Sequence, residues 1–203
     1  MTQKQRLYFE NQFMPIYSKG EEIFNLASHA FGAFIGLVIL LVSMRTSIIK
    51  DLHAAEVISL VVYGFSAIVL YGVSAIYHGL NEGLIAKKIF RIIDHCTIYL
   101  LIAGTYTPIC ILSFYHTWQG SFMLAAEWIC AIIGIVINAL WLNNKYVKII
   151  SIFLYILIGG ILYSFGVIFY GLGKRIKWSH SVFHVFCVLG SIVQFIGIYL
   201  MMI

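Results

Sequence analysis

Residues 174–184 read KRIKWSHSVFH, and the last apolar run of the chain begins within this stretch. Three basic side chains come first, and two histidines four positions apart, His180 and His184, follow them. If Ser179 caps a helix here, both imidazoles lie on one face of that helix near a membrane boundary. Such a pair offers two ligands to a metal ion and needs a third from elsewhere. The alternative is one interfacial histidine and one core histidine with an ordinary hydrogen-bond partner.

The composition places the chain in a membrane. Of its 203 residues, 62% are hydrophobic and 10% are charged, whereas soluble domains average about 45–50% apolar and about 25% charged residues. Charged residues are nearly absent from runs of about 20 residues, the length at which a helix crosses about 30 Å of hydrocarbon. We therefore expect an all-α integral membrane protein with several spans, and a soluble globular fold is excluded.

The positive charge of the chain concerns orientation in the bilayer. The net charge of +5 comes from Lys and Arg in the connections between apolar runs, where it reports topology and not affinity for nucleic acid. No nucleic-acid module is visible. The cysteines form no C-x-x-C pair and fall in apolar runs, so we expect free thiols at Cys96, Cys110, Cys130 and Cys187.

Six apolar runs divide the chain. Residues 1–20 are polar, aromatic and mildly basic and lack the apolar core of a signal peptide. We expect them to form a cytoplasmic or interfacial segment before a single transmembrane domain over residues 21–203. The runs cover residues 23–44, 57–78, 89–114, 121–142, 147–172 and 182–203.

The run 147–172 leaves two topologies open. If it crosses the membrane once, eight of the 13 Lys and Arg residues lie on the side of the N-terminus and five on the other; if it folds back, the split is eleven to two. The positive-inside rule favours folding back with the N-terminus in the cytoplasm. Yet this run is too short for two full crossings at about 1.5 Å per residue. A re-entrant hairpin broken at Gly159 and Gly160 satisfies both constraints only if its backbone is buried against protein.

Polar side chains inside the runs are few, and each is costly in lipid, so each is a candidate functional residue. Ser74 and His78 share one face at the end of the second run, and Asp94 lies near the start of the third. The alternatives are an interfacial His78 and a local ion pair between Asp94 and Arg91. An even number of crossings before the last run brings His78, Asp94 and the two histidines of residues 174–184 to one depth on the basic side.

Three neutral imidazoles with one open position are the composition of a catalytic zinc site. The sequence therefore predicts Zn²⁺ ligands at His78, His180 and His184. Asp94 would then hold a water molecule or accept its proton, and the Ser74 hydroxyl would orient the water or a ligand.

A second group of polar residues precedes these. Glu22, Asn25 and His29 fall on one face of the first run. They form either a network that packs this span against its neighbours or an accessory part of the same site. His95 follows Asp94 directly and is expected to point away, and Glu127 has no identifiable partner. The G-x-x-x-G pair Gly32 and Gly36 is expected to permit close helix packing.

Several motifs resemble one known family. In chain order they are EEIFNLASHAFGAFIG, SAIYH, RIIDHCTIYLLIAGTYTP, GGILYSFGVIFY, HSVFH and VLGS, between Glu22 and Ser191. They resemble the haemolysin III-like membrane proteins of the progestin and adipoQ receptor (PAQR) superfamily. The resemblance implies a seven-helix bundle with a cytoplasmic N-terminus and zinc near the cytoplasmic face, held by His78, His180 and His184 beside Ser74 and Asp94. Only six strong runs are present here, so one span is short or missing.

Three functions follow as hypotheses. The first, which the resemblance also suggests, is a zinc-dependent membrane hydrolase of lipid amides or esters. The second is a non-enzymatic membrane protein with structural zinc: a cytolytic or pore-forming factor, a lipid sensor or a regulator of membrane composition. The third is a proton- or ion-coupled transporter that uses Glu22, His29, Asp94 and Glu127 as a relay. Membrane lipid is the expected partner in the first two.

Overall fold

The computed structural model describes residues 3, 14–114, 117–144, 146–147 and 178–202. Within these residues the chain is helical and contains no strand. The helices are α2 (Lys19–Ile49), α3 (Ala54–Gly79), α4 (Ile85–Phe114), α5 (Trp118–Trp141) and α8 (Ser179–Met202). Four of them, α2 to α5, are long and apolar enough to cross a membrane, and α8 carries a shorter apolar stretch over His180–Ile196.

Five of the six predicted runs correspond to these helices, but most helices extend beyond the apolar residues. α2 begins at Lys19 because Ser18 and Glu21 form a capping box: the Ser18 side chain accepts from the Glu21 backbone N–H, and the Glu21 carboxylate accepts from the Ser18 N–H at 2.9 Å. This S-x-x-E signal satisfies helix-terminal donors ahead of the apolar stretch. α8 begins at Ser179, so the cap position belongs to Trp178 and not, as predicted, to Ser179.

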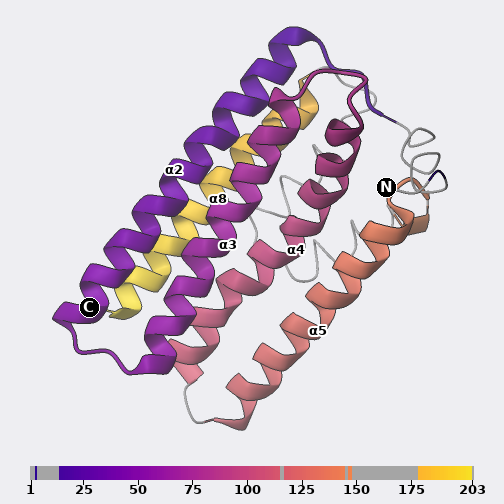
Figure 1. The fold of residues 1–203 in the computed structure, drawn as a ribbon. Coiled ribbons are helices and arrows are strands. Elements are labelled where there is room, and N and C mark those ends of the chain that lie inside the picture. The colour runs from indigo at the N-terminus through magenta and orange to yellow at the C-terminus, as the bar shows by residue number, and fades with distance from the viewer. Residues whose placement is uncertain (1–2, 4–13, 115–116, 145, 148–177, 203) are drawn as a thin grey trace.

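The helices alternate in direction along the chain, and α8 lies beside α2 (Figure 1). α2 packs against α3, α3 against α4, and α4 against α5, while α8 packs against α2 and α4. The start of α2, the end of α3, the start of α4 and the start of α8 consequently meet at one end of the bundle (Figure 1). Every predicted metal ligand lies on one of these helix ends.

Glycines allow the close contact between α2 and α3. A Cβ atom on Gly32 would lie 2.8 Å from Cγ of Tyr71, and one on Gly36 would lie 3.0 Å from the backbone nitrogen of Ile68. Neither position accepts a side chain without movement of its neighbour. The predicted packing role of this G-x-x-x-G pair is confirmed.

The run 147–172 lies outside the described residues apart from Val147, and so does the predicted break at Gly159 and Gly160. Described residues on either side of it lie at the same end of the bundle. Asn143 accepts a hydrogen bond of 3.0 Å from Arg91 near the start of α4, and the Trp178 N–H donates to Glu21 at the start of α2, at 2.9 Å. This is the placement that the fold-back topology requires; a count of seven spans is not established.

Candidate metal centre

Three buried imidazoles converge at the end of the bundle where α3 ends and α8 begins. His78, His180 and His184 each expose 8% or less of their surface. They can each offer one ligand nitrogen such that all three atoms lie within 4.8 Å of one another. The Nε2 atoms of His180 and His184 are 3.0 Å apart, as expected for a pair four positions apart on one helix face. Within the described residues, this is the one group of its kind.

These residues fit a zinc ion. Two nitrogens on one tetrahedral zinc, each at about 2.0–2.1 Å, lie about 3.3–3.4 Å apart, close to the separation within the α8 pair. Nε2 of His78 is buried and has no hydrogen-bond partner, although the ring's other nitrogen is bonded. A buried lone pair without a partner is costly unless a cation or a donor meets it.

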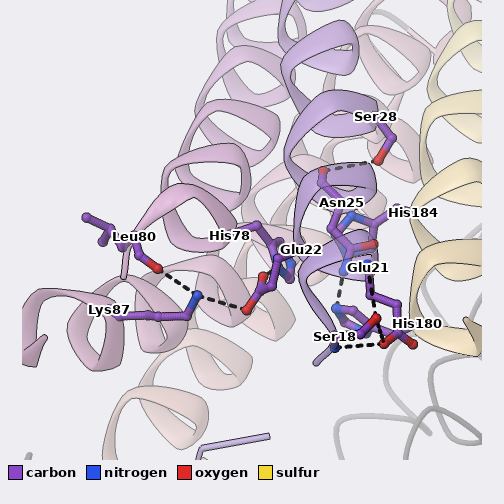
Figure 2. Close-up of polar contacts among 10 residues, drawn as sticks. All are labelled: Ser18, Glu21, Glu22, Asn25, Ser28, His78, Leu80, Lys87, His180 and His184. Carbon is purple, nitrogen blue, oxygen red and sulfur yellow. Dashed lines mark hydrogen bonds and ion pairs between the residues drawn. The ribbon is translucent and has the colours of Figure 1, made fainter. Parts of the chain in front are cut away.

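Glu22 fixes the orientation of His78 (Figure 2). Nδ1 of His78 donates a hydrogen bond of 2.6 Å to Oε2 of Glu22. Because a carboxylate only accepts, Nδ1 carries the hydrogen, and in the neutral ring that a metal ligand requires the lone pair is on Nε2. Metal-bound histidines generally have a carboxylate or carbonyl on the second nitrogen. Glu22 thus joins α2 to α3 and contacts a member of the cluster.

Aromatic side chains cover the histidines. The Tyr17 ring stacks on His180, with centroids 5.1 Å apart, and meets His78 edge-on at 5.8 Å. Trp178 adopts a φ of 65°, a left-handed conformation that is uncommon for this residue type. Its backbone N–H donates to Oε1 of Glu21, and its indole ring packs against Gly20 and Phe24. The sequence analysis did not single out Tyr17 or Glu21. The S-x-x-E spacing at the start of α2 is a signal that could have identified Glu21.

Asp94 lies near the cluster without belonging to it. It is 7% exposed and interacts electrostatically with His78. The Ser74 hydroxyl lies beside its carboxylate, without the geometry of a full hydrogen bond. Oδ2 of Asp94 lies 3.4 Å from Nδ1 of His95. The prediction that His95 points away from Asp94 is therefore wrong. Nδ1 of His95 also donates a hydrogen bond of 2.8 Å to the Arg91 carbonyl, one turn earlier in α4, and this bond keeps the ring on the side of Asp94.

Asn25 and His29 extend the polar region into the bundle. The ring of His29 stacks on His184 with centroids 3.6 Å apart and an interplanar angle of 26°. Asn25 is fully buried, His29 is 3% exposed, and neither side chain has a hydrogen-bond partner. Both residues predicted as accessory thus lie next to the cluster.

Glu127 lies far from this region. Its electrostatic partners are Tyr106 and Cys110 of α4, 12 and 16 residues after Asp94, a rise of about 18–24 Å at 1.5 Å per residue. A relay from Asp94 to Glu127 would have to bridge this interval. The transporter hypothesis has no support among the described side chains.

A bundle of apolar helices with a buried cluster of imidazoles at one end defines a multi-pass membrane protein with a candidate metal centre. The chain belongs to the haemolysin III family: residues 17–161 match the family described as "Haemolysin-III related". It is 32% identical over 199 residues to "Hemolysin-3" of Bacillus cereus, covering 86% of this chain and 89% of that protein. It is also 31% identical over 200 residues to "Hemolysin-3 homolog" of Bacillus subtilis (strain 168), covering 86% and 91%.

Proposed function

We propose that this protein is a zinc-dependent membrane hydrolase of lipid amides or esters, with Zn²⁺ held by His78, His180 and His184. The observation that supports the proposal is the convergence of three buried imidazoles near the Asp94 carboxylate, whose ion contact is with His95 and not with one of the three. Three protein ligands leave a fourth position, which is the arrangement of catalytic rather than structural zinc. Membrane lipid is the substrate that a site enclosed by apolar helices would meet.

The surrounding residues have distinct roles in this proposal. Bound zinc supplies Lewis-acid chemistry, activating a water molecule and polarising an acyl carbonyl. Asp94 would accept a proton from water at the cluster, since its carboxylate is buried near His78 and, among the described residues, its one ion contact is with His95. Ser74 orients the water or the acyl group through its buried hydroxyl. Glu22 keeps the lone pair of His78 directed at the cluster.

Orientation and domain organisation complete the proposal. The end of the bundle that holds the histidines faces the cytoplasm, as does the N-terminus. Residues 1–20 form a cytoplasmic or interfacial segment, and residues 21–203 form one transmembrane domain.

The metal content of the purified protein tests the proposal. We expect about one zinc per chain in the wild type and a loss of most of it in His184→Ala, because two imidazoles bind far more weakly than three. His53→Ala is the matched control, since His53 is an exposed imidazole at the opposite end of the bundle. A wild-type chain without zinc, or undiminished zinc in His184→Ala, contradicts the proposal.

A second candidate is a cytolytic protein in which zinc only fastens α3 to α8. The names of the two Bacillus relatives, "Hemolysin-3" and "Hemolysin-3 homolog", favour it. It requires the same three ligands but gives no role to Asp94, so substitution of Asp94 separates the two candidates.

A further inference from the structure

Lys87 is a buried cation beside the cluster. It lies in the first turn of α4 and is 3% exposed. Its Nζ donates to Oε1 of Glu22 at 2.8 Å and to the Leu80 carbonyl at 2.8 Å (Figure 2). It also lies 5.3 Å from the centroid of the Tyr77 ring. The ammonium group is therefore held by two acceptors and an aromatic face.

The contacts of Glu22 explain why this cation matters for the metal centre. One carboxylate oxygen accepts from Lys87 and the other from His78. With Oε1 held by Lys87, the carboxylate plane is fixed, and Oε2 remains in place for Nδ1 of His78. The chain thus contains a continuous series of contacts from the start of α4, through α2, to one predicted ligand at the end of α3.

Folding stability alone is a weak explanation for this arrangement. Burying an ion pair costs desolvation energy that its attraction often fails to exceed, and apolar replacements of buried pairs are frequently neutral or stabilising. What an apolar pair cannot do is hold a hydrogen on Nδ1 of His78. The ion pair therefore has a use that packing does not supply.

We infer that Lys87 is a positioning residue of the metal centre, acting through Glu22 to keep the Nε2 lone pair of His78 directed at His180 and His184. This inference rests on the proposed function, because it concerns the same three ligands. It adds a residue from the first turn of α4, where a lysine would otherwise be assigned to membrane orientation alone.

Metal binding by the full-length protein in detergent tests this inference. Co²⁺ titration measures both the dissociation constant and the visible spectrum of the bound ion. We expect Lys87→Met to weaken binding about 10–100-fold, the usual effect of losing an outer partner of a metal ligand, and to alter the spectrum. Lys87→Arg keeps charge and donors and should restore part of the affinity. The matched control, Lys88→Met, removes the same charge from a half-buried neighbour and should bind as the wild type.

A double-mutant cycle shows whether Lys87 acts through Glu22. In a Glu22→Gln background, Lys87→Met should cause no further loss of Co²⁺ affinity, whereas independent effects would add. Wild-type affinity in Lys87→Met, an equal loss in Lys88→Met, or additive losses in the cycle overturns the inference but leaves the proposed function intact. A wild-type protein that binds no Co²⁺ or Zn²⁺ overturns both. If Lys87→Met does not fold, Lys87→Gln replaces it in the same cycle.

Discussion

Two carboxylates near the histidines differ in how their oxygens are used. Glu22 has both oxygens engaged, one by His78 and one by Lys87. Asp94 is at least as deeply buried, but its one ion contact within the described part of the chain is longer, 3.4 Å to His95. A carboxylate with both oxygens held is suited to orienting a ligand. One held by a single, longer ion contact is suited to accepting a proton, provided that water reaches it.

Substitution of Asp94 distinguishes the hydrolase from the cytolytic candidate. For a hydrolase, Asp94→Ala should retain zinc and lower fatty-acid release from acylated lipids by about 10²–10⁴-fold, the range expected for loss of a general base. For a cytolytic protein with structural zinc, Asp94→Ala should lyse membranes as the wild type does. The wild type and Asp94→Ala are assayed in liposomes at equal zinc content, by fatty-acid release and by leakage of an enclosed dye. Unchanged release in Asp94→Ala would argue against the proposed role of this residue.

At this scale, the sequence predicted which polar residues gather at the site better than it predicted their contacts. His78, His180 and His184 could be predicted from the sequence, because polar groups in apolar runs are rare and helical spacing fixes the face on which each lies. Lys87 and Tyr17 could not be predicted, since both lie at the ends of spans, where basic and aromatic residues are common for reasons of membrane orientation. Which partner a side chain meets depends on the packing of helices, and no local pattern reports it.

Tyrosine hydrogen bonds from α3 to α8 accompany the meeting of ligands from distant parts of the chain. Tyr71 of α3 donates to the Cys187 carbonyl at 2.7 Å and lies 2.6 Å from Oγ of Ser191. Tyr63 donates to the Ser191 carbonyl at 2.7 Å. These contacts set the height of α8 along α3, and with it the separation between His78 and the α8 pair.

Removing one of these hydroxyls should affect both stability and metal binding. Tyr71→Phe leaves a buried carbonyl and a buried hydroxyl with one partner fewer, at a cost of about 1–3 kcal/mol. We expect a lower unfolding temperature and weaker zinc retention during dialysis. Tyr99→Phe is the matched control, because the Tyr99 hydroxyl accepts from Asn138 at 2.9 Å and joins α4 to α5 instead. Equal zinc loss in both variants would mean that the α3–α8 contacts do not set the site.

Hydropathy predicted the helices that the structure describes, though not where they end. Apolar runs locate the spans because about 20 such residues are needed to cross the hydrocarbon. Polar caps then extended α2 by a full turn beyond its predicted start. The hydrogen bonds between α3 and α8 had no local signal, because tyrosines that bond to backbone carbonyls are not distinguishable in sequence from those that face lipid.

At the scale of the whole molecule, charge and site lie at the same end. Lys19, Lys87 and Arg91 belong to the end of the bundle that holds the histidines, whereas Arg45 and Lys50 belong to the other. Asn143 and Trp178 also lie at the histidine end through their contacts with Arg91 and Glu21. We therefore predict, from the positive-inside rule, that this end of the bundle faces the cytoplasm.

Labelling of single cysteines in intact cells tests this orientation. Asn81 and Lys50 are both exposed and lie in the connections at opposite ends of α3. In a chain whose four native cysteines are replaced, Lys50→Cys should react with a membrane-impermeant maleimide added to whole cells. Asn81→Cys, close to His78, should react only after the membrane is permeabilised. The reverse pattern would place the histidine cluster at the outer face, where the proposed hydrolase would act on lipids of the opposite leaflet.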